Sequence, residues 1–92
     1  MINKETREKI FNFASQHEVD VSILDYPAFD NSIVGITEEG RLVYDLDKMV
    51  KEYSKDNKCS EEEALEFIDY NTRRAIPYMG ENAPIIITKL EG

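Results

Sequence analysis

A capped amphipathic segment that begins at Ser60 places the strongest constraint on how this chain folds. Ser60 and Glu63 have the S-x-x-E spacing of a capping box, which opens helices. At about 100° per residue, one broad and mostly apolar face then collects Ala64, Leu65, Phe67, Ile68, Thr72 and Ala75. The pattern predicts a helix over 61–75 that buries this face, with Pro77 at or just after its end.

Asn71 falls in the middle of that predicted apolar face. A buried amide without hydrogen-bond partners costs roughly 1–3 kcal/mol. We therefore expect Asn71 to be either a structural clamp, which bonds the backbone of the loop after the helix, or part of a site.

A β-hairpin is the clearest feature of the middle of the chain. Residues 32–37 and 41–44 flank Glu38-Glu39-Gly40, and a three-residue loop that ends in glycine is a common hairpin turn. The predicted register opposes Ile36 to Leu42 and Val34 to Tyr44, which places all of these side chains on one face. The opposite face then holds Ile33, Gly35 and Val43.

The remaining patterns predict the other elements of a single domain over residues 1–92. Asn3 and Asp45 are plausible N-caps of helices over 3–16 and 46–56. Residues 21–24 and 85–88 are typical of strands, and 26–31 of a turn-rich connector. The order α-β-β-β-α-α-β predicts a small α+β fold: a largely antiparallel sheet of three to four strands, packed against helices that lie mainly on one face.

The negative charge of the chain is concentrated in its middle third. The 92 residues carry a net charge of −8. Residues 18–47 contribute 8 Asp and Glu against the single base Arg41, which gives −7. Direct binding to nucleic acid is disfavoured, because no basic patch can form there. An acidic face suits a basic protein partner, although net charge also simply favours solubility.

The sequence favours a cytoplasmic protein without metal or cofactor. Cys59 is the only cysteine and His17 the only histidine, so neither an internal disulfide nor a zinc pattern can be assembled. The first residues are too polar for a signal peptide. No apolar run approaches the ~20 residues of a membrane span.

Motifs of catalysis are lacking, so we expect a non-enzymatic protein. The chain has no P-loop, G-x-S-x-G or G-x-G-x-x-G pattern. His17 ends the first predicted helix, where the helix dipole favours it. Asp45 and Asp47 resemble the start of a calcium loop, but its glycine and later glutamate are missing.

The end of the 61–75 helix is the chemically richest segment. Tyrosine and arginine are enriched at protein interfaces. We therefore single out a candidate partner-binding surface formed by Tyr70, Arg74, Tyr78 and Met79. The alternative is structural, with Arg74 paired to Asp45 or Glu66.

Two runs of this chain, V-G-I-T-E-E-G-R-L-V-Y-D and D-Y-N-T-R-R-A-I-P-Y-M-G, resemble a family of small uncharacterised proteins. These proteins are encoded in genomes, phages and mobile elements of Gram-positive, often gut-dwelling, bacteria. The resemblance covers roughly residues 26–90. It implies a genomic setting and assigns no activity to any residue.

Three hypotheses of function follow. The leading one is a non-enzymatic protein-interaction module, in its sharper form a phage or mobile-element inhibitor or regulator of a nucleic-acid-binding host protein, with carboxylates from Glu38, Glu39, Asp45 and Asp47. The second is a homodimer through the outer sheet face, with Ile33, Val43 and Ile86. The third is a small ligand-binding protein or enzyme centred on Asn71 and Tyr78, which predicts a closed pocket with convergent polar groups.

Overall fold

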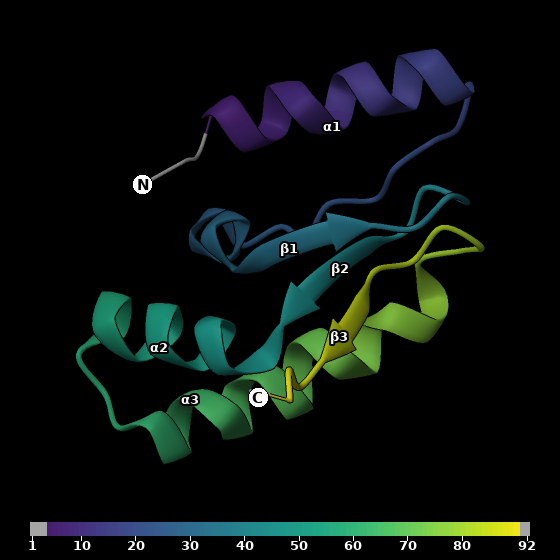
Figure 1. The fold of residues 1–92 in the computed structure, drawn as a ribbon. Coiled ribbons are helices and arrows are strands. Elements are labelled where there is room, and N and C mark those ends of the chain that lie inside the picture. Colours follow the sequence, from purple (N-terminus) through teal and green to yellow (C-terminus); the bar gives the residue numbers. More distant parts are fainter. Residues whose placement is uncertain (1–3, 91–92) are drawn as a thin grey trace.

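The computed structural model describes residues 4–90, which form a small α+β domain of helices packed with a short sheet (Figure 1). The elements in chain order are α1 (Lys4–His17), η1 (Pro27–Ser32), β1 (Ile33–Ile36), β2 (Leu42–Asp45), α2 (Leu46–Asn57), α3 (Glu61–Phe67), η2 (Ile68–Arg73), η3 (Ile76–Tyr78) and β3 (Ile85–Ile87). The predicted cap Asn3 lies outside the described residues.

Two predicted helix starts are confirmed at atomic detail. The Asp45 carboxylate accepts a hydrogen bond from the Asp47 N–H at 3.1 Å and caps α2. The Ser60 hydroxyl accepts from the Glu63 N–H at 3.1 Å, and the Glu63 carboxylate accepts from the Ser60 N–H at 3.4 Å. Local hydrogen bonding therefore fixes both starts, as the short-range patterns indicated.

The predicted hairpin forms, with one change of register. Gly40 adopts φ +92°, a conformation that suits glycine, and Ile36 opposes Leu42 as expected. The ladder is irregular between Ile33 and Gly35, so Ile33 opposes Tyr44. The predicted pairing of Val34 with Tyr44 is therefore wrong. An extra residue in one strand moves side chains off their predicted face, and Val34 is 37% exposed.

The third strand corrects the predicted sheet. β3 pairs with β2 in parallel, in the order β1-β2-β3, so the sheet is mixed rather than largely antiparallel. Figure 1 shows the reason: α2 and α3 run back along each other and return the chain to the beginning of β2. Parallel neighbours need a long connection of this kind. The Arg41 side chain also donates to the Ala83 carbonyl at 2.8 Å, beside the start of β3.

The strand predicted over 21–24 does not form, and that stretch is coil. The Leu24 N–H, which a ladder would have used, donates instead to the Tyr44 hydroxyl at 3.1 Å. The connector over 26–31 is the 3₁₀ turn η1, which begins at Pro27. The Tyr44 hydroxyl thus replaces the backbone acceptor that a neighbouring strand would have supplied.

One core joins the sheet to all the main helices. Its buried members are Ile10, Leu24, Phe29, Leu42, Tyr44, Met49, Val50, Ala64 and Ile68. The predicted burial of Leu42 and Tyr44 under α2 and α3 is confirmed, and both side chains are fully buried. Ile33 and Ile86 also pack against this core. The prediction that they belong to the outer sheet face is wrong, because both lie opposite Tyr44.

The predicted 61–75 helix is interrupted by a π-helix, η2. A π-turn adds one residue, which rotates the following side chains by about 100° relative to an α-helix. Ala64 and Ile68 are buried as predicted, whereas Asn71 and Ala75 are exposed. Leu65, which precedes the π-helix, is 38% exposed as well. The expectation that Asn71 lies within a buried stripe is therefore wrong.

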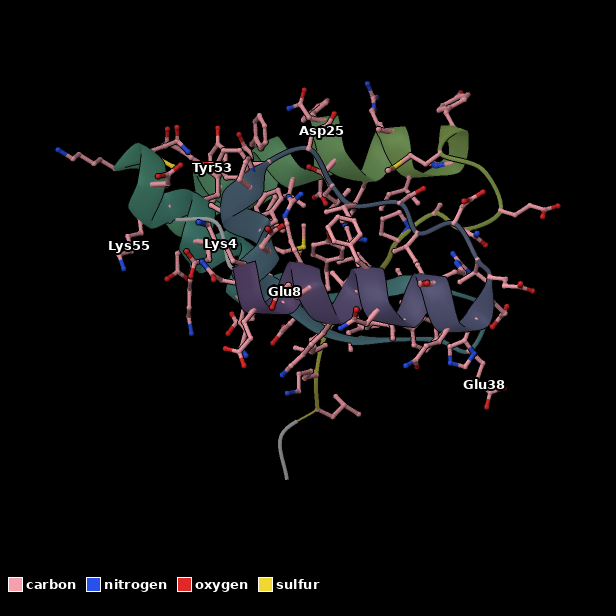
Figure 2. The ribbon with its side chains drawn as sticks, turned by 90° about the horizontal axis from the view of Figure 1, so that it is seen from above. Lys4, Glu8, Asp25, Glu38, Tyr53 and Lys55 are labelled. Carbon is pink, nitrogen blue, oxygen red and sulfur yellow. The ribbon has the colours of Figure 1, made fainter. Side chains whose placement is uncertain are left out.

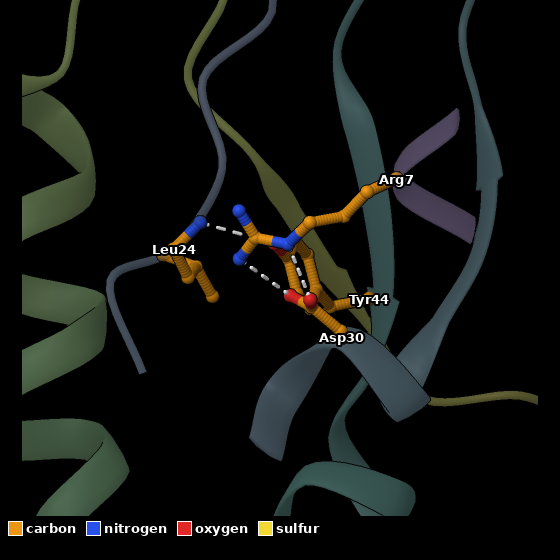
Figure 3. A network of polar contacts seen from close by, with 4 residues as sticks. All are labelled: Arg7, Leu24, Asp30 and Tyr44. Carbon is orange, nitrogen blue, oxygen red and sulfur yellow. Dashed lines mark hydrogen bonds and ion pairs between the residues drawn. The ribbon is translucent and has the colours of Figure 1, made fainter. Parts of the chain in front are cut away.

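A buried polar network attaches α1 to the rest of the fold (Figure 3). The Arg7 guanidinium donates to both carboxylate oxygens of Asp30, at 2.6 and 3.2 Å. Asp30 is buried, and its hydrogen bond is the main cause that raises the pKa of Arg7. Burial raises the pKa of Tyr44, beside them, to about 12.

Across residues 4–90, no helix is both long and apolar enough to cross a membrane.

Candidate interaction surface

The candidate partner-binding residues lie at the end of the α3–η2–η3 segment. Tyr70 is 65% exposed and Tyr78 is 90% exposed. The Arg74 guanidinium carbon lies 5.1 Å from the centre of the Tyr70 ring, which is a cation–π contact. The predicted proximity of Tyr70 and Arg74 is therefore confirmed. We call Tyr70, Arg74 and Tyr78 the tyrosine surface.

The π-helix under this surface is held by its own side chains. The Asn71 amide donates to the Phe67 carbonyl, one turn earlier, at 3.0 Å. Arg73 pairs with Asp69 at 3.0 Å. Asn71 is thus a clamp, but it bonds the preceding turn rather than the loop after the helix. π-turns are frequent at functional sites, because they present side chains that a regular helix would turn elsewhere.

An apolar groove lies beside the tyrosine surface, between η2 and the coil before η1. It has a volume of about 210 Å³ and is open to solvent. Its lining residues are Leu24, Asp25, Tyr26, Phe29, Phe67, Asn71, Thr72, Ala75 and Met79. We call it the aromatic groove. In Figure 2 the coil that carries Asp25 runs alongside the green helical segment, which places the two walls of the groove.

Aromatic contacts support both walls of this groove. The Tyr26 ring meets Phe29 edge-on at 4.7 Å, and Phe67 stacks on Tyr53 at 4.3 Å. The Tyr26 hydroxyl donates to the Asp56 carboxylate and accepts from the Asn57 amide. Burial and the bond to Asp56 raise the pKa of Tyr26 to about 12. The phenol therefore stays neutral near pH 7.

The candidate residues divide between surface and groove. Met79 is half-buried in the groove wall, whereas Tyr78 is not among the lining residues. Asn71 lines the groove together with Asp25 and Thr72. The closed pocket expected around Asn71 and Tyr78 is not what the structure shows here, since the groove is open. Within residues 4–90, Arg74 forms no ion pair with Asp45 or Glu66, so the predicted pairing of Arg74 with these carboxylates is wrong.

The candidate carboxylates do not converge on one patch. Glu38 and Glu39 are exposed at the hairpin turn, and Figure 2 shows Glu38 at one extremity of the molecule. Asp45 lies at the other end of β2, where it is buried as the cap of α2. Asp47 is exposed and pairs with Lys51 at 3.1 Å. Strand β2 therefore separates the first pair from the second.

Neither His17 nor Cys59 lines the aromatic groove. His17 stacks on Phe13 with ring centres 4.1 Å apart, at the end of α1. The Cys59 thiol is half-buried between α2 and α3. Throughout the described part of the chain, no group of three His, Cys, Asp or Glu side chains could hold a metal ion.

Sequence reasoning identified the exposed tyrosines and missed most of the groove. Leu24, Asp25 and Tyr26 come from a stretch that looked like a strand followed by a turn. The sequence signal that could have indicated this wall of the groove is the spacing of the two aromatic residues Tyr26 and Phe29.

Comparisons with protein-family models, with curated proteins and with solved structures give no match. The resemblance to small proteins of phages and mobile elements therefore stays a prediction from the two sequence runs that carry it.

Proposed function

We propose that this chain is a non-enzymatic interaction module that binds another protein through the tyrosine surface and the adjoining aromatic groove. The observation that carries the proposal is the exposure of Tyr70 and Tyr78, at 65% and 90%. Tyr70 lies on the π-helix that is clamped by its own side chains, and Tyr78 ends η3, which follows it. Large exposed aromatic side chains beside an apolar groove are a feature of recognition sites.

The contacts around Arg74 favour tight rather than diffuse recognition. Its guanidinium is already placed over the Tyr70 ring, so little side-chain freedom remains to be lost on binding. Tyrosine has few rotatable bonds and offers both an apolar ring and a hydroxyl. A partner's apolar side chain fits the groove, while Tyr70, Arg74 and Tyr78 contact its rim.

The genomic setting implied by the resemblance gives the proposal a sharper form. The chain then acts as a phage or mobile-element regulator or inhibitor of a basic, nucleic-acid-binding host protein. The net charge of −8 supports attraction to such a partner. Because the candidate carboxylates lie beyond the two ends of β2 or at its last residue, this attraction is better described as long-range steering than as a single acidic patch.

The test is quantitative capture from a lysate of the bacterium that encodes the chain, followed by affinity measurement on each captured protein. Tyr70→Ala/Tyr78→Ala removes the two exposed rings. Phe11→Ala removes an aromatic ring on α1 that is 59% exposed and remote from the surface, so it is the matched control. We expect at least about a tenfold loss of affinity for the double variant, equal to about 1.4 kcal/mol. Equal affinities for both variants would contradict the proposal.

A second candidate is self-association through the outer face of the sheet. Val43 lies beside Ile85 in the register, and Ile85 and Ile87 alternate onto the same face. All of these apolar side chains are half-buried. Sedimentation that shows a monomer at high micromolar concentration would exclude it.

A further inference from the structure

A second groove lies between the beginnings of α2 and α3, at the opposite end of the helical segment from the tyrosine surface. It has a volume of about 410 Å³ and is open to solvent. Its lining residues are Leu46, Asp47, Val50, Glu61, Glu62, Leu65 and Thr88. We call it the acid-rimmed groove. Its floor is apolar, and its rim carries three carboxylates.

The floor is an apolar surface that the fold leaves open. Leu46 is half-buried and packs against the core, and Val50 belongs to the core itself. Leu65 is 38% exposed, although the helical pattern predicted its burial. An outward-facing Leu65 beside the half-buried Leu46 and the buried Val50 offers a contact surface for one apolar side chain.

The charges on the rim are largely uncommitted. The side chains of Glu61 and Glu62 make no hydrogen bond or ion pair with any residue between 4 and 90, whereas the Glu63 side chain beside them is used in the capping box. Asp47 pairs with Lys51 at 3.1 Å, in a bridge exposed to solvent. The helix dipole favours acids at the start of α3. It gives no reason for the open apolar floor between them.

We propose that the acid-rimmed groove binds a cationic amphipathic peptide segment of a protein partner. An apolar side chain of the segment lies on Leu46, Val50 and Leu65. Lysine or arginine side chains on either side of it reach Glu61, Glu62 and Asp47. Charge complementarity selects this occupant, because the rim repels the phosphates of nucleic acids and anionic lipids. The site is separate from the tyrosine surface and goes beyond the function proposed above.

The test uses a fluorescein-labelled peptide made of repeated Lys-Leu-Leu-Lys units, with binding followed by fluorescence anisotropy. Two further peptides replace every Lys by Glu or every Leu by Ser. We expect only the Lys-Leu peptide to bind, with an affinity that falls as salt is raised. Binding of the Lys-Ser peptide with equal affinity would show diffuse charge attraction and overturn the proposal, as would failure of the Lys-Leu peptide to bind.

Variants of the protein locate the site. Glu61→Gln/Glu62→Gln should weaken binding of the Lys-Leu peptide by about tenfold, because it removes two of the three carboxylate charges on the rim. Glu38→Gln/Glu39→Gln makes the same change in net charge at the distant hairpin turn and should leave the affinity nearly unchanged. Equal weakening by the two pairs would overturn the proposal.

Two more variants separate the floor from the rim and this site from the tyrosine surface. Leu65→Ser leaves the net charge of the protein unchanged and should weaken binding of the Lys-Leu peptide. An unchanged affinity would contradict the role of Leu65 in the floor of the groove. Tyr70→Ala/Tyr78→Ala should bind the peptide as the unaltered protein does. Loss of binding there would move the site to the tyrosine surface. Far-UV circular dichroism of every variant checks that the helices remain.

Discussion

Arg7 and Asp30 show how a single pair of residues can decide where an element lies. The Asp30 carboxylate is fully buried, while the Arg7 side chain is 30% exposed. Both oxygens of Asp30 are used by Arg7. A buried charge that loses its partner is far more costly than a surface ion pair that is broken. This contact should therefore stabilise the docking of α1 more than any other polar contact that α1 makes.

We expect Arg7→Ala to lower the free energy of unfolding by about 2–3 kcal/mol, because it leaves Asp30 buried without its counter-charge. Urea denaturation followed by circular dichroism measures the change. Lys9→Ala is the control, since Lys9 lies 3.8 Å from Glu5 in an exposed pair and should change stability by less than about 0.5 kcal/mol. Similar losses from the two variants would show that the Arg7 contact is no stronger than an exposed pair.

The pairing of Arg7 with Asp30 could not be predicted from the sequence, for a physical reason. Asp30 lies shortly after Pro27, in a stretch typical of exposed turns, where aspartate is common. Its partner lies 23 residues away on another element. By contrast, the exposed Tyr70 and the contact between Tyr70 and Arg74 follow from helical spacing over one turn. Contacts between residues close in the sequence could be predicted, whereas the burial of a turn residue by a distant element could not.

At the scale of elements, starts and turns were predictable because their hydrogen bonds are local. The capping box at Ser60 and the cap at Asp45 each involve residues no more than three apart. The π-helix η2 could not be predicted, because the apolar residues of this segment have the spacing of a regular α-helix. It moved Asn71 out to solvent. The aromatic groove was missed for a related reason, since its two walls come from separate elements.

The two glycines with positive φ give a test at this scale. Gly40 and Gly80 both have φ +92°, so alanine is strained at either position. At Gly40 an added Cβ would also lie 2.8 Å from the Val19 side chain, whereas at Gly80 it meets nothing within 4 Å. We expect Gly80→Ala to cost about 1 kcal/mol and Gly40→Ala about 2–3 kcal/mol.

Chemical denaturation of the two variants under the same conditions measures these costs. The difference between them isolates the contact of the hairpin turn with the segment after α1. If Gly40→Ala and Gly80→Ala lose the same stability, the chain around Val19 yields freely and does not support the turn.

At the scale of the whole molecule, stability should fall steeply in alkali. Burial is the main cause that raises the pKa of both Tyr44 and Tyr26 to about 12. In the unfolded chain a tyrosine has a pKa of about 10. The folded state thus holds these protons more tightly, which stabilises it fully below about pH 10. The stabilisation is lost as the pH rises from about 10 to 12.

Urea denaturation at a series of pH values measures this loss. Tyr44→Phe should make the fall between about pH 10 and 12 shallower, while it lowers stability at pH 7 because the Leu24 N–H loses its acceptor. Tyr78→Phe changes an exposed phenol and is the matched control. A pH dependence that is identical in all three proteins would contradict the assigned role of Tyr44.

The parallel pairing of β2 with β3 also determines the order in which a nascent chain can acquire its sheet. Translation delivers β1 and β2 together, so the hairpin can close early. The partner strand Ile85–Ile87 emerges only after both intervening helices have been made. Until then one edge of β2, with its backbone amides and carbonyls, has no neighbour. Ribosome-bound intermediates of this protein should therefore be the species most prone to wrong strand pairing.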